Sequence, residues 1–200
     1  TDRISALLSH ERDLQMSVQE ELAKLQEKSR PIIMAPYNNS WAELFSTEGE
    51  KLRQILGESA IRIDHIGSTS VPGLAAKDII DIQITLESLD NAEEFCEKMK
   101  SAGYQQRGGI RNDCLIGESD DNKLRKLYFR EAYGDRRTHI HVRQQGLLNQ
   151  EFPLLFRDYL RANESVRMAY ELIKQRLANI YPESINGYLY IKDPVMDIIY

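Results

Sequence analysis

The chain has 200 residues and a formal net charge of −5 at pH 7, a length that fits one domain or one domain with an appendage. The negative charge argues against a protein built for non-specific nucleic-acid binding, so no nucleic-acid partner is expected. Its two cysteines, Cys96 and Cys114, form no CxxC pair, which favours free thiols in a reducing compartment. No apolar run is long enough to span a bilayer and no signal peptide is visible, so we expect a cytoplasmic protein that has no membrane partner.

Residues 2 to 28 are predicted to form a long, charged helix that stops before Pro31. The apolar residues near heptad a and d positions are Ile4, Leu7, Leu14, Val18 and Leu25. Charged residues interrupt this seam, which leaves two alternatives: a homodimer contact, or a helix packed on its own domain. We therefore divide the chain into an N-terminal helical extension, residues 1–30, and a domain of residues 31–200.

Two elements precede the central stretch of the chain. Residues 32–34 are a candidate for a short strand. A helix is predicted between Ser40 and Gly57, because apolar residues recur at helical spacing and glycine is typical of a helix end. Its core-facing residues are Trp41, Leu44, Phe45, Leu52 and Ile55.

Residues 61–85 are the most informative part of the sequence and read IRIDHIGSTSVPGLAAKDIIDIQIT. Two short β-branched runs, 61–66 and 79–85, flank a turn rich in Gly, Pro and Ser, which predicts strand, loop and strand. In the second run the isoleucines share one parity and Asp81 has the other, so Asp81 faces away from the core. A carboxylate on a strand beside a Gly-Ser turn suits the binding of a phosphate and its metal.

A helix, a loop and a hairpin follow in that order. The helix is predicted to run to Ala102, and residues 105–124 lack periodicity, which indicates a mobile or ligand-covering loop. Residues 124–132 and 138–143 are predicted to pair as a β-hairpin around a Tyr-Gly-Asp turn.

One face of the predicted hairpin is apolar, and the other is polar and largely cationic. His139 and His141 alternate with apolar residues, so both imidazoles share the polar face, with Cβ atoms about 7 Å apart. Two such imidazoles reach one metal or two oxygens of one phosphate, and a purely structural pair of histidines is a third alternative. The hairpin arginines that could neutralise a triphosphate are Arg130, Arg137 and Arg143.

The C-terminal part is predicted to be helical. Pro153 suits the first turn of one helix, and a second helix is expected between Asn163 and Pro182. Pro194 is expected to break the tail and to leave one last helical turn after it.

The central stretch resembles the GrpB family, whose motif is close to H-I-G-S-T-x-V-P-G-L-x-A-K-x-x-I-D. The matching residues are His65, Gly67, Ser68, Thr69, Val71, Pro72, Gly73, Leu74, Ala76, Lys77, Ile80 and Asp81. The Pro-Tyr-Asn-x-x-Trp run from Pro36 and the His-Ile-His-Val run from His139 resemble two further signatures of the family, so the likeness spans roughly residues 31 to 180.

The resemblance implies an α+β fold of the nucleotidyltransferase type: a mixed β-sheet with helices packed mainly on one face. It also implies binding of a nucleoside triphosphate or other phosphorylated small molecule with a divalent metal, Mg²⁺ or Mn²⁺, and transfer of a nucleotidyl group to an acceptor. The catalytic candidates are then Ser68 and Asp81. Candidates for phosphate binding are Gly67, Ser68, Thr69, Lys77, Arg130, Arg143, His139 and His141. Candidates for metal binding are Asp81, Asp78, His139 and His141.

The sequence departs from the superfamily pattern at Gln83, where a second acidic residue is expected. A glutamine carbonyl is a poorer Mg²⁺ ligand than a carboxylate. This favours an alternative function, a non-catalytic module that binds a nucleotide or a partner and has a degraded metal site; in that case Gln83→Glu should strengthen metal binding. GrpB-like domains fused to dephospho-coenzyme A kinase imply a link to coenzyme A or nucleotide metabolism, but this sequence has no G-x-x-x-x-G-K-[ST] motif.

Overall fold

The structure is a computed structural model that describes residues 18, 22–23, 28–116, 118 and 120–199. Residues 18, 22 and 23 are helical, but the rest of the predicted N-terminal helix up to residue 27 lies outside the described residues. The helical extension of residues 1–30 and the homodimer contact through it therefore stay predictions.

Five strands form one mixed sheet in the order β1-β2-β5-β4-β3. β2 and β5 are parallel, and the other neighbours are antiparallel, including the predicted β4–β5 hairpin. The strands are β1 (Arg62–Ile66), β2 (Ile80–Leu86), β3 (Gln105–Gln106), β4 (Lys126–Arg130) and β5 (Thr138–Gln144). Because β2 and β5 lie side by side, the Asp81 and His139 regions of the sequence come together at the centre of the sheet.

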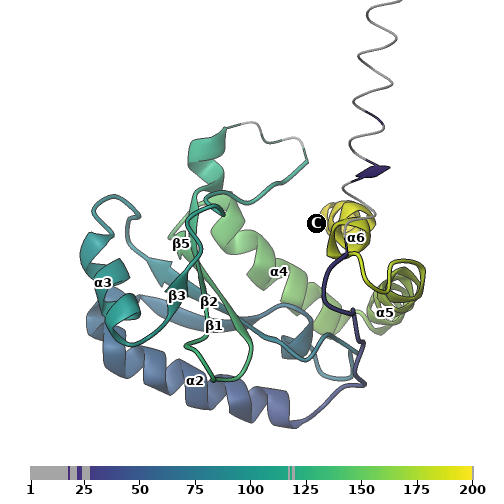
Figure 1. Ribbon diagram of the computed structural model, residues 1–200, viewed down its shortest axis with the longest axis horizontal. Coiled ribbons are helices and arrows are strands. Elements are labelled where there is room, and N and C mark those ends of the chain that lie inside the picture. The colour runs from purple at the N-terminus through teal and green to yellow at the C-terminus, as the bar shows by residue number, and fades with distance from the viewer. Residues whose placement is uncertain (1–17, 19–21, 24–27, 117, 119, 200) are drawn as a thin grey trace, which may run out of the picture.

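Helices lie on both sides of this sheet and beyond its end (Figure 1). Helices α2 and α3 cover the isoleucine face, α4 lies across the opposite face, and α5 and α6 pack together next to the Gly-Ser turn. The helices are α2 (Ser40–Leu56), α3 (Glu93–Ser101), α4 (Leu148–Ala162), α5 (Glu164–Ile180) and α6 (Ile185–Ile199). Three short 3-10 turns are η1 (Gly57–Ser59), η2 (Ser68–Ser70) and η3 (Asp121–Leu124).

The main core lies between the sheet and α2, and its composition follows the predicted parity. Ile80, Ile82 and Ile84 are buried together with Phe129 and Ile140 on the same face of the sheet. Burial of each of these side chains contributes about 1.5–3 kcal/mol to the free energy of unfolding. A shift of the strand register by one residue would lose this contribution, so burial fixes the register. The predicted α+β fold with a mixed sheet is thus confirmed.

Three local predictions were wrong. Residues 32–34 form no strand: the segment between two prolines makes one isolated bridge, from Ala35 to Ala76, because proline lacks the N–H that a ladder needs. Helix α4 starts at Leu148, well before Pro153. Helix α6 continues through Pro194, and its following residues pack on a buried cluster around Leu74, which offsets the lost backbone hydrogen bond.

Candidate functional site

The candidate site is built on three side chains from the two central parallel strands. Asp81 of β2 and His139 of β5 are register partners, and the His139 Nδ1 lies 3.1 Å from the Asp81 Oδ1. His141 lies two residues further along β5 on the same face. One ligand atom from each of these three residues lies within 4.8 Å of the other two. Carboxylate and imidazole ligands bind metals at about 2.0–2.2 Å, so this donor set fits one divalent ion after a small movement.

The surroundings put two of these groups in their metal-binding forms. Burial alone would raise the pKa of Asp81, but the hydrogen bond and charge of His139 outweigh it and lower that pKa. The pKa of His141 lies well below its usual value, because the ring is desolvated and faces the charges of Arg143 and Lys126. An ionised carboxylate and a neutral imidazole are the forms that ligate metals.

Tyr128 of β4 holds both imidazole rings in place. Its ring centroid lies 5.7 Å from that of His139 and 5.1 Å from that of His141. The site therefore has an aromatic wall on the side of β4, which limits the rotation of the two imidazoles.

The Gly-Ser turn lies directly against Asp81. Gly67 has φ +69°, and a Cβ added there would collide with the Asp81 carboxylate, so only glycine allows this approach. Ser68 follows as the first residue of η2, and its Oγ accepts a hydrogen bond of 3.0 Å from the Lys174 Nζ. The turn and the Asp81 carboxylate are thus in close contact.

Lys174 is a site residue that the sequence reading missed. Only 2% of it is exposed, and its Nζ also donates to the Ala75 carbonyl oxygen at 2.6 Å. Burial, followed by the charge of Lys192, lowers the pKa of Lys174 to about 7. The one signal in the sequence is its spacing: Lys174 follows Tyr170 by four residues, on the buried stripe of α5.

Gln83, at the position of the missing acid, is fully buried and doubly hydrogen-bonded. Its Oε1 accepts from the Arg143 Nη1 at 2.7 Å, and its Nε2 donates to the Gln150 carbonyl oxygen at 2.9 Å. Asp113 pairs with the same Arg143 at 2.8 and 3.0 Å and with Lys126 at 2.6 Å. Gln83 is the register partner of His141, and both of its polar atoms are taken up by the buried network of Arg143 and the Gln150 backbone.

Other predicted site residues are held elsewhere. Arg143 donates to Asp113 and Gln83, and its Nη2 also lies 3.4 Å from the His141 Nδ1. The Asp78 carboxylate accepts from the Trp41 Nε1 at 2.7 Å and pairs with Arg136, outside the cluster of ligand atoms. The Thr69 Oγ1 lies 3.0 Å from the His65 Nε2 and donates to a backbone carbonyl. Asp78 and Thr69 therefore lie outside the proposed site, and Arg143 contacts it through His141.

Two predicted cations lie at the edge of the site. The Lys77 Nζ lies 5.3 Å from the centre of the Tyr188 ring, and burial lowers the pKa of Lys77. Arg130 pairs with His139 across β4 and β5, but its guanidinium donates to Glu131 at 3.0 and 3.1 Å. Arg130 therefore flanks the Asp81–His139–His141 cluster, and Lys77 lies close enough to Asp81 to interact with its charge.

The part of the chain that the structure describes holds no helix both long and apolar enough to cross a membrane. Its two cysteines, Cys96 and Cys114, are free, as expected.

Several known proteins resemble this chain over most of its length. "UPF0157 protein YqkA" of Bacillus subtilis is 38% identical over 164 residues, which cover 82% of this chain and 45% of the relative. A "Dephospho-CoA kinase" of Mycobacterium bovis is 36% identical over 76% of this chain and 41% of its own length. The chain thus spans less than half the length of these two relatives.

A crystal structure described as "conserved protein GrpB from Enterococcus faecalis" is 34% identical, covers 84% of this chain and 94% of that one, and has a TM-score of 0.68. The Cid1 poly(U) polymerase with Mg and 3'-dATP bound reaches a TM-score of only 0.47 at 12% identity, too weak a likeness to support an argument. The family model described as "GrpB protein" matches residues 31–200. The chain therefore belongs to the GrpB family.

Proposed function

We propose that this chain binds a nucleotide or another phosphorylated small molecule through a divalent metal held by Asp81, His139 and His141. The observation that carries the proposal is the donor set itself, one carboxylate and two imidazoles with ligand atoms within 4.8 Å of one another. Imidazole ligands suit Mn²⁺ or Zn²⁺ better than Mg²⁺. Of the two metals expected from the sequence, Mn²⁺ is the one that this donor set favours.

The turn beside Asp81 supplies the contacts to phosphate. Lys174 donates to the Ser68 Oγ, and the Ser68 hydroxyl, which also hydrogen-bonds the Tyr170 side chain, would turn to donate its single hydrogen to a phosphate oxygen. Backbone N–H groups at Gly67 and Ser68 and the ammonium of Lys77 add further donors. When bound, the metal neutralises phosphate charge, and these groups orient the phosphate beside it.

The environment of Gln83 favours a binding module over a transferase. Nucleotidyl transfer in the two-metal manner needs a second carboxylate at the site, and Gln83 offers a buried amide already bonded to Arg143 and Gln150. Transfer of a nucleotidyl group to an acceptor hydroxyl, with release of pyrophosphate, is the second candidate function. The relatives named dephospho-CoA kinase favour a ligand from coenzyme A or nucleotide metabolism.

A ligand screen by thermal shift tests the proposal, because a ligand of the native state raises the melting temperature. The four nucleoside triphosphates and dephospho-coenzyme A are each added with Mn²⁺, with Mg²⁺ or with EDTA. We expect a shift that needs metal, is largest with Mn²⁺ and is lost in Asp81→Asn. Equal shifts of the melting temperature with metal and with EDTA would contradict the proposed site. A separate assay that detects release of pyrophosphate from a nucleoside triphosphate would instead establish the transferase.

A further inference from the structure

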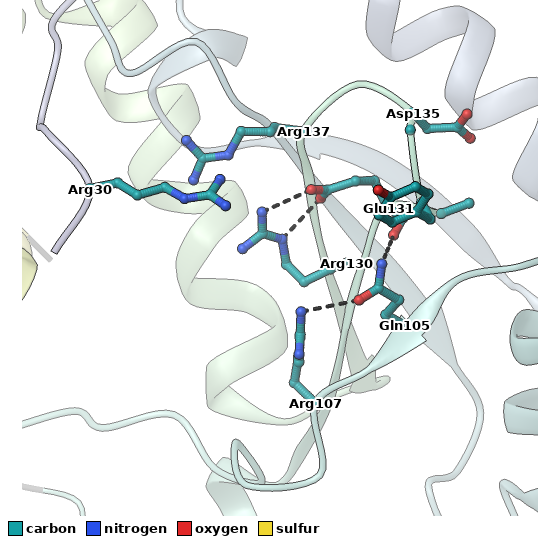
Figure 2. A pocket seen from close by; sticks show the side chains of 10 residues that line it. Arg30, Gln105, Arg107, Arg130, Glu131, Asp135 and Arg137 are labelled. Atoms are coloured by element: carbon teal, nitrogen blue, oxygen red, sulfur yellow. Dashed lines mark hydrogen bonds and ion pairs between the residues drawn. The ribbon is translucent and has the colours of Figure 1, made fainter.

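A pocket of about 350 Å³ opens at the end of the β4–β5 hairpin, next to the site described above. Four arginines line it together with two carboxylates (Figure 2). The charged residues of the lining are Arg30, Arg107, Arg130, Arg137, Glu131 and Asp135. We call this feature the arginine pocket.

The positive charge of the arginine pocket is mostly unbalanced. Glu131 neutralises Arg130 through two hydrogen bonds. Asp135 pairs with Lys51 at 3.0 Å, and Figure 2 shows its carboxylate directed away from the arginines. The guanidinium of Arg107 donates to the neutral amide of Gln105.

Two of the arginines have guanidinium groups without a partner among the residues that the structure describes. In the described part of the chain, Arg30 and Arg137 have no ion-pair or side-chain hydrogen-bond partner. Together with Arg107, they leave three guanidinium groups unmatched by a carboxylate. This cluster of positive charge lies in a chain whose net charge is −5. It favours binding of a ligand with two or more negative charges.

The arginine pocket adjoins the metal-binding candidates through Arg130. Arg130 of β4 and His139 of β5 are partners across the antiparallel pair, and such side chains lie on one face with Cβ atoms about 5 Å apart. Arg137 stands two residues before His139. A ligand held at the cluster can therefore reach the pocket along the same face of the sheet.

We infer that the arginine pocket binds the far phosphate groups of the ligand whose near phosphate lies at Asp81, His139 and His141. The ligand class is a small molecule with a chain of at least two phosphate groups. Guanidinium forks match phosphate oxygens in pairs, which ammonium groups do not. The inference rests on the proposed function for the near phosphate only, since the lining of the arginine pocket includes none of the three metal-binding candidates.

The test is isothermal titration of tripolyphosphate in EDTA, so that the metal plays no part. Arg137→Gln removes a guanidinium that has no partner among the described residues, and Arg176→Gln, on an exposed position of α5 outside the pocket, is the matched control for net charge. We expect Arg137→Gln and Arg107→Gln each to weaken binding by about tenfold or more, as for a lost charge-assisted bond. The control should bind as the wild type does.

Equal affinity of tripolyphosphate for wild type, Arg107→Gln and Arg137→Gln would overturn the inference. Citrate binding as tightly as tripolyphosphate would overturn the phosphate class, and a single-stranded oligonucleotide binding more tightly than either would overturn the small-molecule class. A parallel titration of Mn²⁺ without phosphate separates the two proposals. Loss of tripolyphosphate binding in the pocket variants supports the inference on the arginine pocket, whether or not the wild type binds Mn²⁺. A wild type that binds no Mn²⁺ would contradict only the proposed metal site.

Discussion

Gly67 and Asp81 lie in direct contact: the glycine backbone packs against the Asp81 carboxylate at a point where a Cβ would overlap it. This contact links the turn to the strand and fixes where the carboxylate points. It also explains why the turn needs glycine, since Gly67 has φ +69°, a conformation that side chains disfavour.

Gly67→Ala should therefore damage the site and not only the stability. We expect a loss of about 2 kcal/mol or more in the free energy of unfolding, from backbone strain plus the collision, and a Mn²⁺ affinity at least about tenfold weaker. Gly57→Ala is the matched control, because Gly57 also has positive φ but no atom within 4 Å of the added Cβ. Urea unfolding and Mn²⁺ titration of both variants separate strain from collision; equal Mn²⁺ affinities in the two would count against the role of Gly67.

Lys174 should make the stability depend on pH. Its pKa is lowered to about 7 in the folded chain, whereas an exposed lysine titrates at about 10.4. Between these values the unfolded state holds more protons than the folded state, so the free energy of unfolding should rise with pH from about 7 to about 10, at about 1.4 kcal/mol per pH unit at most.

Lys174→Met should make that rise clearly smaller, and Lys100→Met, at an exposed lysine of α3, should leave it unchanged. The Met variant also leaves the Ala75 carbonyl oxygen without the Lys174 donor, which costs about 1–3 kcal/mol at high pH. Urea unfolding across this pH range is the measurement. A wild-type curve parallel to that of Lys174→Met would show that Lys174 titrates normally.

Gln83→Glu should fail to restore a metal ligand, contrary to the expectation from the sequence. The Gln83 amide donates to the Gln150 carbonyl oxygen, and a glutamate would place a carboxylate oxygen against that carbonyl. We expect a loss of about 1–3 kcal/mol in stability and an unchanged Mn²⁺ affinity. Gln83→Met, which removes both hydrogen bonds and adds no charge, is the control. A clear gain in Mn²⁺ affinity in Gln83→Glu but not in Gln83→Met would instead support a degraded metal site at this position.

Asp113 should be essential for stability, although it lies in a stretch with no sequence periodicity. Asp113→Asn leaves the buried cations Arg143 and Lys126 without their carboxylate, and breaking such a group costs about 3–5 kcal/mol. Asp121→Asn, an exposed aspartate of η3, is the control and should change stability little. Thermal and urea unfolding measure both, and a small effect in Asp113→Asn would mean that the network contributes little.

The strand faces could be predicted because side chains alternate across a strand with a fixed period. This period placed the isoleucines of β2 in the core and brought Asp81, His139 and His141 to the other face, once β2 and β5 were neighbours. The hairpin followed from its turn residues. That β2 pairs with β5 rests on contacts between distant parts of the chain, which a local pattern does not specify.

The partners of the polar groups could not be predicted for the same reason. Lys174 lies 106 residues from Ser68, and a lysine in a helix is ordinarily solvated. Asp113 lies 30 residues from Arg143, inside a loop interpreted as ligand-covering. Packing also outweighs the tendency of proline to break a helix, so Pro194 stays inside α6.

The central claim is that Asp81, His139 and His141 hold one divalent metal, and titration of Mn²⁺ by calorimetry tests it most directly. The wild type, Asp81→Asn and His141→Gln are compared with His65→Gln, which alters a histidine on the opposite face, stacked on Phe45. The account predicts one Mn²⁺ per chain in the wild type and in His65→Gln, with affinity at least about tenfold weaker in the other two variants. Equal Mn²⁺ affinity in wild type and Asp81→Asn would contradict it.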